Sequence, residues 1–300
     1  MPQLRPRWQL SFATAGVLLV VLVVGSMVRR RRAAGLGAAG TSGTSGTSSA
    51  SILLAFAREF AVIMSLLGFW QLVGSAVHTR VAGAMERGRA IHAWEVAWHL
   101  PSERVLQTAA DAAPTLVRAA DVYYAYAHLN GMALFVGWLW WRHRVGYGRA
   151  RGVIIVSTLA CLVVQTVPVA PPRLLPEFGF VDTALRDGSS VYGAFGEGMA
   201  NQLAAMPSVH VGWAVVVGLY VWRYAPWWAR WIGPAHALVT VLVVVVTANH
   251  WWLDGLVAAG FVVLAELSPR AWAAARAAPW TGPAFLEVGQ SPDGTFGRAP

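Results

Sequence analysis

Long apolar runs are the main feature of this 300-residue chain. The first extends from about Leu10 to Val28, and six more lie at about 51–77, 119–141, 152–170, 207–224, 233–249 and 250–267. Each approaches the ~20 apolar residues that a helix needs to cross a bilayer. The runs lack the alternation of a β-strand, and a helix satisfies its own backbone hydrogen bonds in lipid. The pattern predicts an all-α polytopic membrane protein with a six-helix transmembrane core and one N-terminal transmembrane anchor.

Composition supports a membrane protein and excludes several other classes. Hydrophobic residues make up 56% of the chain and charged residues only 12%, whereas soluble domains carry about 25% charged residues. The net charge of +9 is typical of basic cytoplasmic loops, so we expect no nucleic acid partner. Cys161 is the only cysteine and lies in an apolar run, which excludes an intrachain disulfide. No His/Cys spacing suits zinc, and we expect neither a metal nor a cofactor.

The chain divides into four predicted segments. Residues 1–32 form the anchor, because Arg29–Arg32 directly follow the first apolar run as a stop-transfer signal rather than a cleavage site. Residues 33–50 contain the repeat TSGTSGTSS and are expected to be a flexible linker. Residues 51–270 form the catalytic core, and 271–300 form a cytoplasmic tail.

Arginine distribution gives the expected orientation in the plasma membrane. Placing Arg29–Arg32 and the 142–151 cluster in the cytoplasm leaves more arginines inside than outside. The segment 78–118 fits the expected excess of cytoplasmic arginine poorly, because it places several arginines on the outside. Its tryptophans and acidic residues indicate an amphipathic helix along the membrane interface. This topology puts the 171–206 loop, His210 and His250 together on the extracytoplasmic side.

The segment His250-Trp-Trp-Leu-Asp254 is the first candidate for chemistry. On a helix, positions i and i+4 share a face, so Asp254 would accept a hydrogen bond from the His250 ring. Such a carboxylate fixes the tautomer of the imidazole and leaves its other nitrogen free to attack. A His–Asp pair that only caps a helix end at the headgroup level explains this motif equally well.

Two further motifs complete a possible phosphate site. Pro207 suits the first turn of a helix, Ser208 and the free amides of that turn suit an anion, and His210 suits a proton donor. Prolines around Arg173 stiffen a turn from which the guanidinium can contact phosphate. Taken singly, the alternatives are an ordinary N-cap and a lipid-headgroup anchor. Together, on one membrane face, the motifs favour phosphoryl transfer through a phosphohistidine.

The order and spacing of these motifs resemble a known family. Pro-Ser-x-His, followed 40 residues later by the first residue of His-x-x-x-Asp, resembles the type 2 phosphatidic acid phosphatase superfamily, which also includes vanadium haloperoxidases. The likeness covers about residues 55–267. Three stretches are similar to the branch that contains fungal inositol phosphorylceramide synthase and its bacterial relatives, namely APPRLLPEFGFVDT, AAMPSVHVGWA and TANHWWLDGLVAAG.

The resemblance implies a role for each matching residue. His250 matches the nucleophile that forms a phosphohistidine, and Asp254 matches the carboxylate that orients it. His210 matches the general acid that protonates the leaving group and then acts as base on the acceptor. Ser208 and Arg173 match phosphate ligands, and such phosphatases need no metal.

The sequence departs from the phosphatase pattern at two places. Thr166 stands where phosphatase members carry a lysine, and Val243 and Val244 stand where they carry Ser-Arg. The branch resembling inositol phosphorylceramide synthase shares this lack. Arg118 and Arg186 are candidate replacements for the missing cations.

Polar residues within or beside the apolar runs are weaker candidates. Arg58 and Glu59 are expected to form a structural ion pair, because charged groups within a membrane span pair with one another. His128 and Asp182 are possible members of a headgroup pocket.

The sequence therefore predicts a membrane lipid phosphatase with its site on the extracytoplasmic face. Its substrate would be a phospholipid or an isoprenoid phosphate. The alternative is a phosphatidylinositol-type headgroup phosphotransferase that passes the phosphoryl group to an alcohol. A non-catalytic lipid transporter is less favoured, because transport does not need a paired nucleophile.

Overall fold

The computed structural model describes residues 11, 13–18, 20, 49–77, 82–188 and 202–269. These residues form helices joined by turns, with one isolated parallel bridge between Val169 and Ala204, so the all-α prediction is confirmed. The chain divides into two compact units. One contains Met1–Trp8 and Gly68–Ala278, and the other contains Gln9–Leu67 and Pro279–Pro300. Every candidate site residue belongs to the first, which we call the core unit.

Little of the predicted N-terminal region can be compared with the structure. Residues 11, 13–18 and 20 are helical, as expected for part of the anchor, while Arg29–Arg32, the linker up to residue 48 and the tail from 271 lie outside the described residues. Helix α2 (Ser49–Val77) covers the first predicted core span. Within α2, Arg58 and Glu59 form the predicted ion pair, with 2.9 Å between Nη2 and Oε1.

Helices occupy all the other predicted spans. The remaining longer helices are α3 (Ala84–Ala97), α4 (Glu103–Asp111), α5 (Pro114–Val122), the π-helix η1 (Tyr123–Ala127), α6 (His128–Arg142), α7 (Arg144–Gln165), α11 (Val209–Tyr224), α12 (Ile232–Val246) and α13 (Trp252–Leu267). Short helices η2 (Pro172–Leu174), η3 (Pro176–Phe178) and α8 (Thr183–Arg186) lie between α7 and α11. Among the helices that could be tested, α7 is long and apolar enough to cross a membrane, and α12 is a shorter apolar helix.

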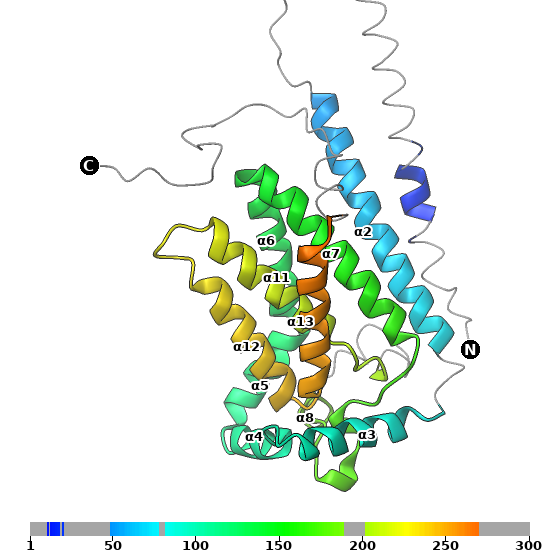
Figure 1. Ribbon diagram of the computed structural model, residues 1–300, viewed down its shortest axis with the longest axis vertical. Coiled ribbons are helices and arrows are strands. Elements are labelled where there is room, and N and C mark those ends of the chain that lie inside the picture. The colour runs from blue at the N-terminus through cyan, green and yellow to red at the C-terminus, as the bar shows by residue number, and fades with distance from the viewer. Residues whose placement is uncertain are drawn as a thin grey trace, which may run out of the picture. The chain divides into compact units, whose positions relative to one another are not determined.

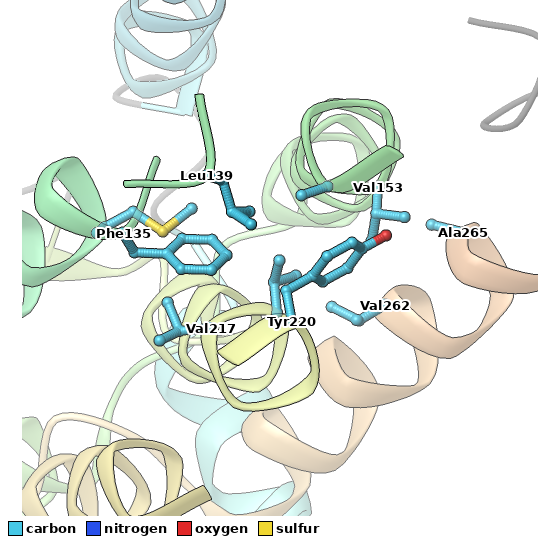
Figure 2. Packing of buried hydrophobic residues seen from close by; sticks show 10 residues of the cluster. Phe135, Leu139, Val153, Val217, Tyr220, Val262 and Ala265 are labelled. Carbon is cyan, nitrogen blue, oxygen red and sulfur yellow. The ribbon is translucent and has the colours of Figure 1, made fainter. Parts of the chain in front are cut away.

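Four of these helices share one apolar core. Side chains from α6, α7, α11 and α13 meet in Figure 2, where the labelled residues are Phe135, Leu139, Val153, Val217, Tyr220, Val262 and Ala265. Helix α12 packs closely on α11, since a Cβ atom at Gly233 would lie 2.9 Å from the Gly218 carbonyl oxygen. Small residues at such a crossing let two helix backbones approach, as they do in membrane proteins.

The C-terminal end of α13 is tied to its neighbours by charge. Glu266 forms ion pairs with Arg149 of α7 and Arg223 of α11, and it accepts a 2.9 Å hydrogen bond from the Tyr220 hydroxyl. This cluster fixes the end of the bundle that lies opposite His250 along α13.

Large apolar side chains also cover the outer faces of the bundle. Exposed examples come from α6, α7, α12 and α13, and they include Leu134, Val163, Leu238 and Leu264. Exposed apolar side chains on four helices of one bundle are consistent with contact with lipid or a partner.

Helices α3 and α4 lie across the end of the bundle where α13 begins (Figure 1). The buried face of α3 carries Glu95, and α4 buries Glu103, whereas Trp94 and Trp98 of α3 are exposed. We expected the 78–118 segment to form an amphipathic helix along the membrane interface. Its described residues form α3, α4 and the first turn of α5, and α3 and α4 turn Glu95 and Glu103 inward.

Candidate active site

Backbone contacts bring the three predicted motifs together. The amide of Arg173 donates to the Ala248 carbonyl at 3.0 Å, just before the His250 motif. The amide of Ser208 donates to the Asp254 carbonyl at 3.0 Å. These bonds join the loop after α7, the start of α11 and the start of α13 at one end of the bundle.

His250 and Asp254 meet as predicted, but not as neighbours along a helix. Helix α13 begins at Trp252, and its N-cap Trp251 has an extended backbone, so His250 precedes the helix. Asp254 is the third helical residue and its Oδ2 accepts from the Trp251 amide at 2.9 Å. The same Oδ2 lies 3.3 Å from His250 Nδ1. The helical i, i+4 explanation is therefore wrong: from the first turn of α13, Asp254 reaches back to the Trp251 amide and to the His250 ring.

The hydrogen bonds of His250 fix its tautomer. Nδ1 lies 2.7 Å from the Ala205 carbonyl oxygen and 3.3 Å from Asp254 Oδ2. A carbonyl oxygen can only accept, so Nδ1 carries a proton, and in the neutral ring the lone pair is on Nε2. His250 and Asp254 are both buried. The site thus presents an unprotonated imidazole nitrogen that is held by two acceptors behind it.

His210 lies beside His250 at the start of α11. Their ring centroids are 6.0 Å apart with 51° between the planes. Tyr124 stacks on the His210 ring at 4.5 Å and lies 6.5 Å from that of His250. Tyr124 comes from the π-helix η1, an element that often occurs at functional sites. The sequence analysis gave Tyr124 no role, although a polar side chain within an apolar run is a signal for one.

Ser208 is the N-cap of α11. It is fully buried, and its Oγ accepts from the Val211 amide at 3.3 Å. We expected Pro207 in the first turn of the helix, but it lies before that turn, because α11 begins at Val209. The Pro207 carbonyl instead accepts from Gln165 Nε2 at 3.0 Å. The Ser208 hydroxyl hydrogen is still available to donate, and phosphate binding by Ser208 stays a prediction.

Arg173 lies in η2 with its side chain buried. Its Nε is 3.6 Å from Asp182 Oδ2. The other oxygen of Asp182 caps α8 by accepting from the Leu185 amide at 2.9 Å. Asp182 is therefore both a helix cap and the ionic neighbour of Arg173, and its predicted place in a headgroup pocket remains a prediction.

His128 lies next to His210, on the side away from His250. Its side chain is 1% exposed, and its ring centroid is 5.0 Å from His210 and 5.7 Å from His236. Neither His128 nitrogen has a hydrogen-bond partner within the described ranges. The Tyr123 hydroxyl is 2.8 Å from His236 Nδ1. The structure therefore places His128, predicted as a possible member of a headgroup pocket, next to His210, and adds His236, which was not predicted.

Arg118 and Arg186, the candidate replacements for the missing cations, are both exposed, and their role stays a prediction. Thr166 is exposed and donates to the Val163 carbonyl, while Val244 is buried in an apolar cluster. Arg186 pairs with Asp111 at 2.8 Å and with Asp187 at 2.9 Å. Arg118 is exposed. Arg173 is the arginine that the structure buries beside the His250 turn.

Comparison with known proteins identifies a family for the part of the chain that contains these residues. Residues 89–267 match the sequence profile of the PAP2 superfamily, and this region contains all three motifs. No curated protein and no solved structure matches the chain. Within the residues that the structure describes, no three His, Cys, Asp or Glu side chains are grouped as a metal ion would require.

Proposed function

The chain belongs to the PAP2 superfamily, whose members act on phosphate esters, and from that premise we propose that it is a membrane phosphatase for lipid-linked phosphates. The observation that carries this proposal is the 6.0 Å separation of the His210 and His250 rings, with buried Asp254 behind His250. Two imidazoles at this distance can contact one phosphoryl group from two sides. The substrate would be a phospholipid or an isoprenoid phosphate.

The first step transfers the phosphoryl group to the enzyme. The lone pair of His250 Nε2 attacks phosphorus, and the bond from phosphorus to the lipid oxygen breaks. Protonated His210 donates its proton to that departing oxygen. Asp254 Oδ2 stabilises the positive charge that develops on the His250 ring. The product is a lipid alcohol and a phosphohistidine.

The second step releases phosphate. Neutral His210 takes a proton from water as the water oxygen attacks phosphorus, and the bond from phosphorus to Nε2 breaks. Inorganic phosphate leaves, His250 is neutral again, and His210 carries the proton for the next cycle. Arg173 and the Ser208 hydroxyl would bind the phosphate oxygens, since a guanidinium and a hydroxyl are suitable donors.

A membrane location agrees with the distribution of apolar side chains. The exposed apolar residues of α6, α7, α12 and α13 would contact lipid tails. Trp94 and Trp98 of α3 would lie at headgroup level, where tryptophan is enriched. Arg142 and Arg144 lie between α6 and α7, at the opposite end from His250, and suit a cytoplasmic end. We propose that the site opens on the extracytoplasmic face of the plasma membrane.

Headgroup transfer is the second candidate. It starts from a phosphodiester lipid, so that after the lipid alcohol has left His250 carries the phosphoryl group together with its headgroup. His210 then takes the proton from an acceptor alcohol as that alcohol attacks phosphorus, and the bond from phosphorus to Nε2 breaks. Thr166 and the apolar pair Val243 and Val244 favour it, because these positions lack the cations that phosphatase members carry. His128 would then contact the alcohol, since its buried nitrogens lie next to His210.

Product analysis distinguishes these reactions. Purified protein should be incubated with a lipid extract, and the products identified by mass spectrometry. We expect free phosphate and a dephosphorylated lipid, whereas a new phosphodiester would identify headgroup transfer. If neither product forms with any phosphorylated lipid, the proposed function is wrong.

Asp254→Asn should lower kcat by about 10- to 100-fold without abolishing turnover. The Ala205 carbonyl lies 2.7 Å from His250 Nδ1 and still selects the correct tautomer in this variant. Asparagine also keeps an oxygen for the Trp251 amide, so the turn should remain folded. Steady-state kinetics would test this, with Asp187→Asn at the surface as the control. A loss as large as that of a His250 variant would show that the carbonyl does not hold the ring.

A further inference from the structure

Three carboxyl groups accept hydrogen bonds from the first amides of α13. Asp254 Oδ2 accepts from Trp251 at 2.9 Å, and Glu95 Oε1 accepts from Leu253 at 2.8 Å. Glu103 Oε1 lies 3.5 Å from the Trp252 amide. Free amides at a helix start need acceptors, but one serine or aspartate cap is the usual solution. Here two additional acids arrive from α3 and α4.

Glu95 and Glu103 are buried together. Each is 2% exposed, and the two carboxyl groups accept from adjacent amides, Glu95 from Leu253 and Glu103 from Trp252, so they lie close together. Burial, followed by this contact with Glu103, raises the pKa of Glu95 to about 9. Both titratable groups that face Glu95 are acids, Glu103 from α4 and Asp254 from α13. At neutral pH the pair therefore shares one proton, and the positive end of the α13 dipole offsets its remaining charge.

We propose that Glu95 and Glu103 are positioning residues, which share one proton and hold the first turn of α13 so that His250 and Asp254 keep their reactive orientation. This inference rests on the proposed function, because it assigns these acids to the catalytic step at His250. Neither carboxyl group needs to touch the substrate. They act through the Trp252 and Leu253 amides, which are adjacent in sequence to Asp254.

The arrangement links the bundle to the helices that cross its end. The Trp252 indole also donates to the Pro101 carbonyl, in the turn between α3 and α4, at 2.6 Å. The turn that carries His250 is thus held from one side by Ala205 and from the other by α3 and α4. A small rotation of the first α13 turn would move Asp254 and change the direction of His250 Nε2. Misplacement of a catalytic group by about 1 Å can cost about 100-fold in rate.

Substitutions at Glu95 test the positioning role at neutral pH. Glu95→Ala removes the acceptor of the Leu253 amide and leaves Glu103 charged, so we expect kcat per folded molecule to fall by about 10- to 100-fold with KM almost unchanged. Glu95→Gln resembles the protonated acid and should restore kcat to within about threefold of the wild type. If Glu95→Ala lowers only the melting temperature, the acids are structural caps and the proposal is wrong.

The pH dependence provides a second test. Above pH 9 the Glu95–Glu103 pair of the wild type should lose its shared proton. The amide of Glu95→Gln has no such proton to lose. The ratio of kcat for Glu95→Gln to that for the wild type should stay flat below pH 8 and rise by about tenfold per pH unit above the Glu95 pKa. Using the ratio cancels any pH dependence due to His210. A ratio that stays flat to pH 10 would overturn the proposal.

Thermal unfolding in detergent tests the shared proton without any substrate. Because the folded pKa of Glu95 lies above its unfolded value of 4.5, its contribution to stability is complete below pH 4.5 and is lost as pH rises toward 9. Glu95→Gln should flatten this fall, whereas Glu86→Gln, on the exposed side of α3, should unfold like the wild type. A wild type that shows this fall but turns over no lipid phosphate would refute the proposed function alone. A wild type that turns over lipid but unfolds like Glu95→Gln at every pH would refute the shared proton.

Discussion

His250→Ala is expected to lower turnover by about four orders of magnitude or more, because it removes the only atom that forms the covalent intermediate. His250 Nε2 is the unprotonated nitrogen of the ring, since Nδ1 is held 2.7 Å from the Ala205 carbonyl. Asp254 faces the opposite edge of the ring, and Tyr124 is a much weaker nucleophile. The remaining site can still bind phosphate but cannot form the phosphoenzyme.

The measurement should follow the intermediate as well as the product. Brief reaction with a lipid labelled in its phosphate, followed by denaturation, should leave an acid-labile label on the wild type and none on His250→Ala. His143→Ala is the matched control, because His143 joins α6 to α7 at the opposite end of the bundle. It should retain label and turnover within about threefold. Label that persists in His250→Ala would identify another nucleophile and contradict the mechanism.

The apolar runs of the sequence are sufficient to predict the longer helices of the bundle. Apolar runs such as 233–249 predict α12 within three residues at its C-terminal end, because burial of a continuous apolar surface determines where a helix forms. The motifs of Arg173, His210 and His250 could also be selected from residue type and spacing. These motifs could also be predicted to lie close together, on the assumption that the spans that carry them are antiparallel neighbours.

The local geometry of the site could not be obtained in this way. Whether His250 belongs to α13 depends on the bond from the Trp251 amide to Asp254 and on the Ala205 carbonyl, which comes from a segment 45 residues earlier. Glu95 and Glu103 looked like the polar side of an interfacial helix. Their burial follows from unsatisfied amides at the start of α13, and these amides become evident only when the three helices are packed.

Replacing His210 by alanine should slow the first step, and the loss of rate should be larger when the departing oxygen is more basic. A lipid alkoxide is strongly basic and needs a proton as it departs, so the expected loss for a lipid phosphate is about 1,000-fold. With an aryl phosphate such as p-nitrophenyl phosphate, the aryl oxygen departs as a stable anion without a proton. The loss of rate for that substrate should therefore be about tenfold or less. Stacking of Tyr124 on His210 at 4.5 Å holds the ring where that proton is delivered.

This difference between substrates separates acid catalysis from a role in binding or folding. If His210 only bound phosphate, the alanine variant would lose the same factor with both substrates, because both carry the same phosphoryl group. If it only supported the fold, the loss would follow the fraction of folded protein and again be equal. His143→Ala should show no dependence on the leaving group. Equal losses for alkyl and aryl phosphates in His210→Ala would therefore remove His210 from the proton transfer, while His250 could still be the nucleophile.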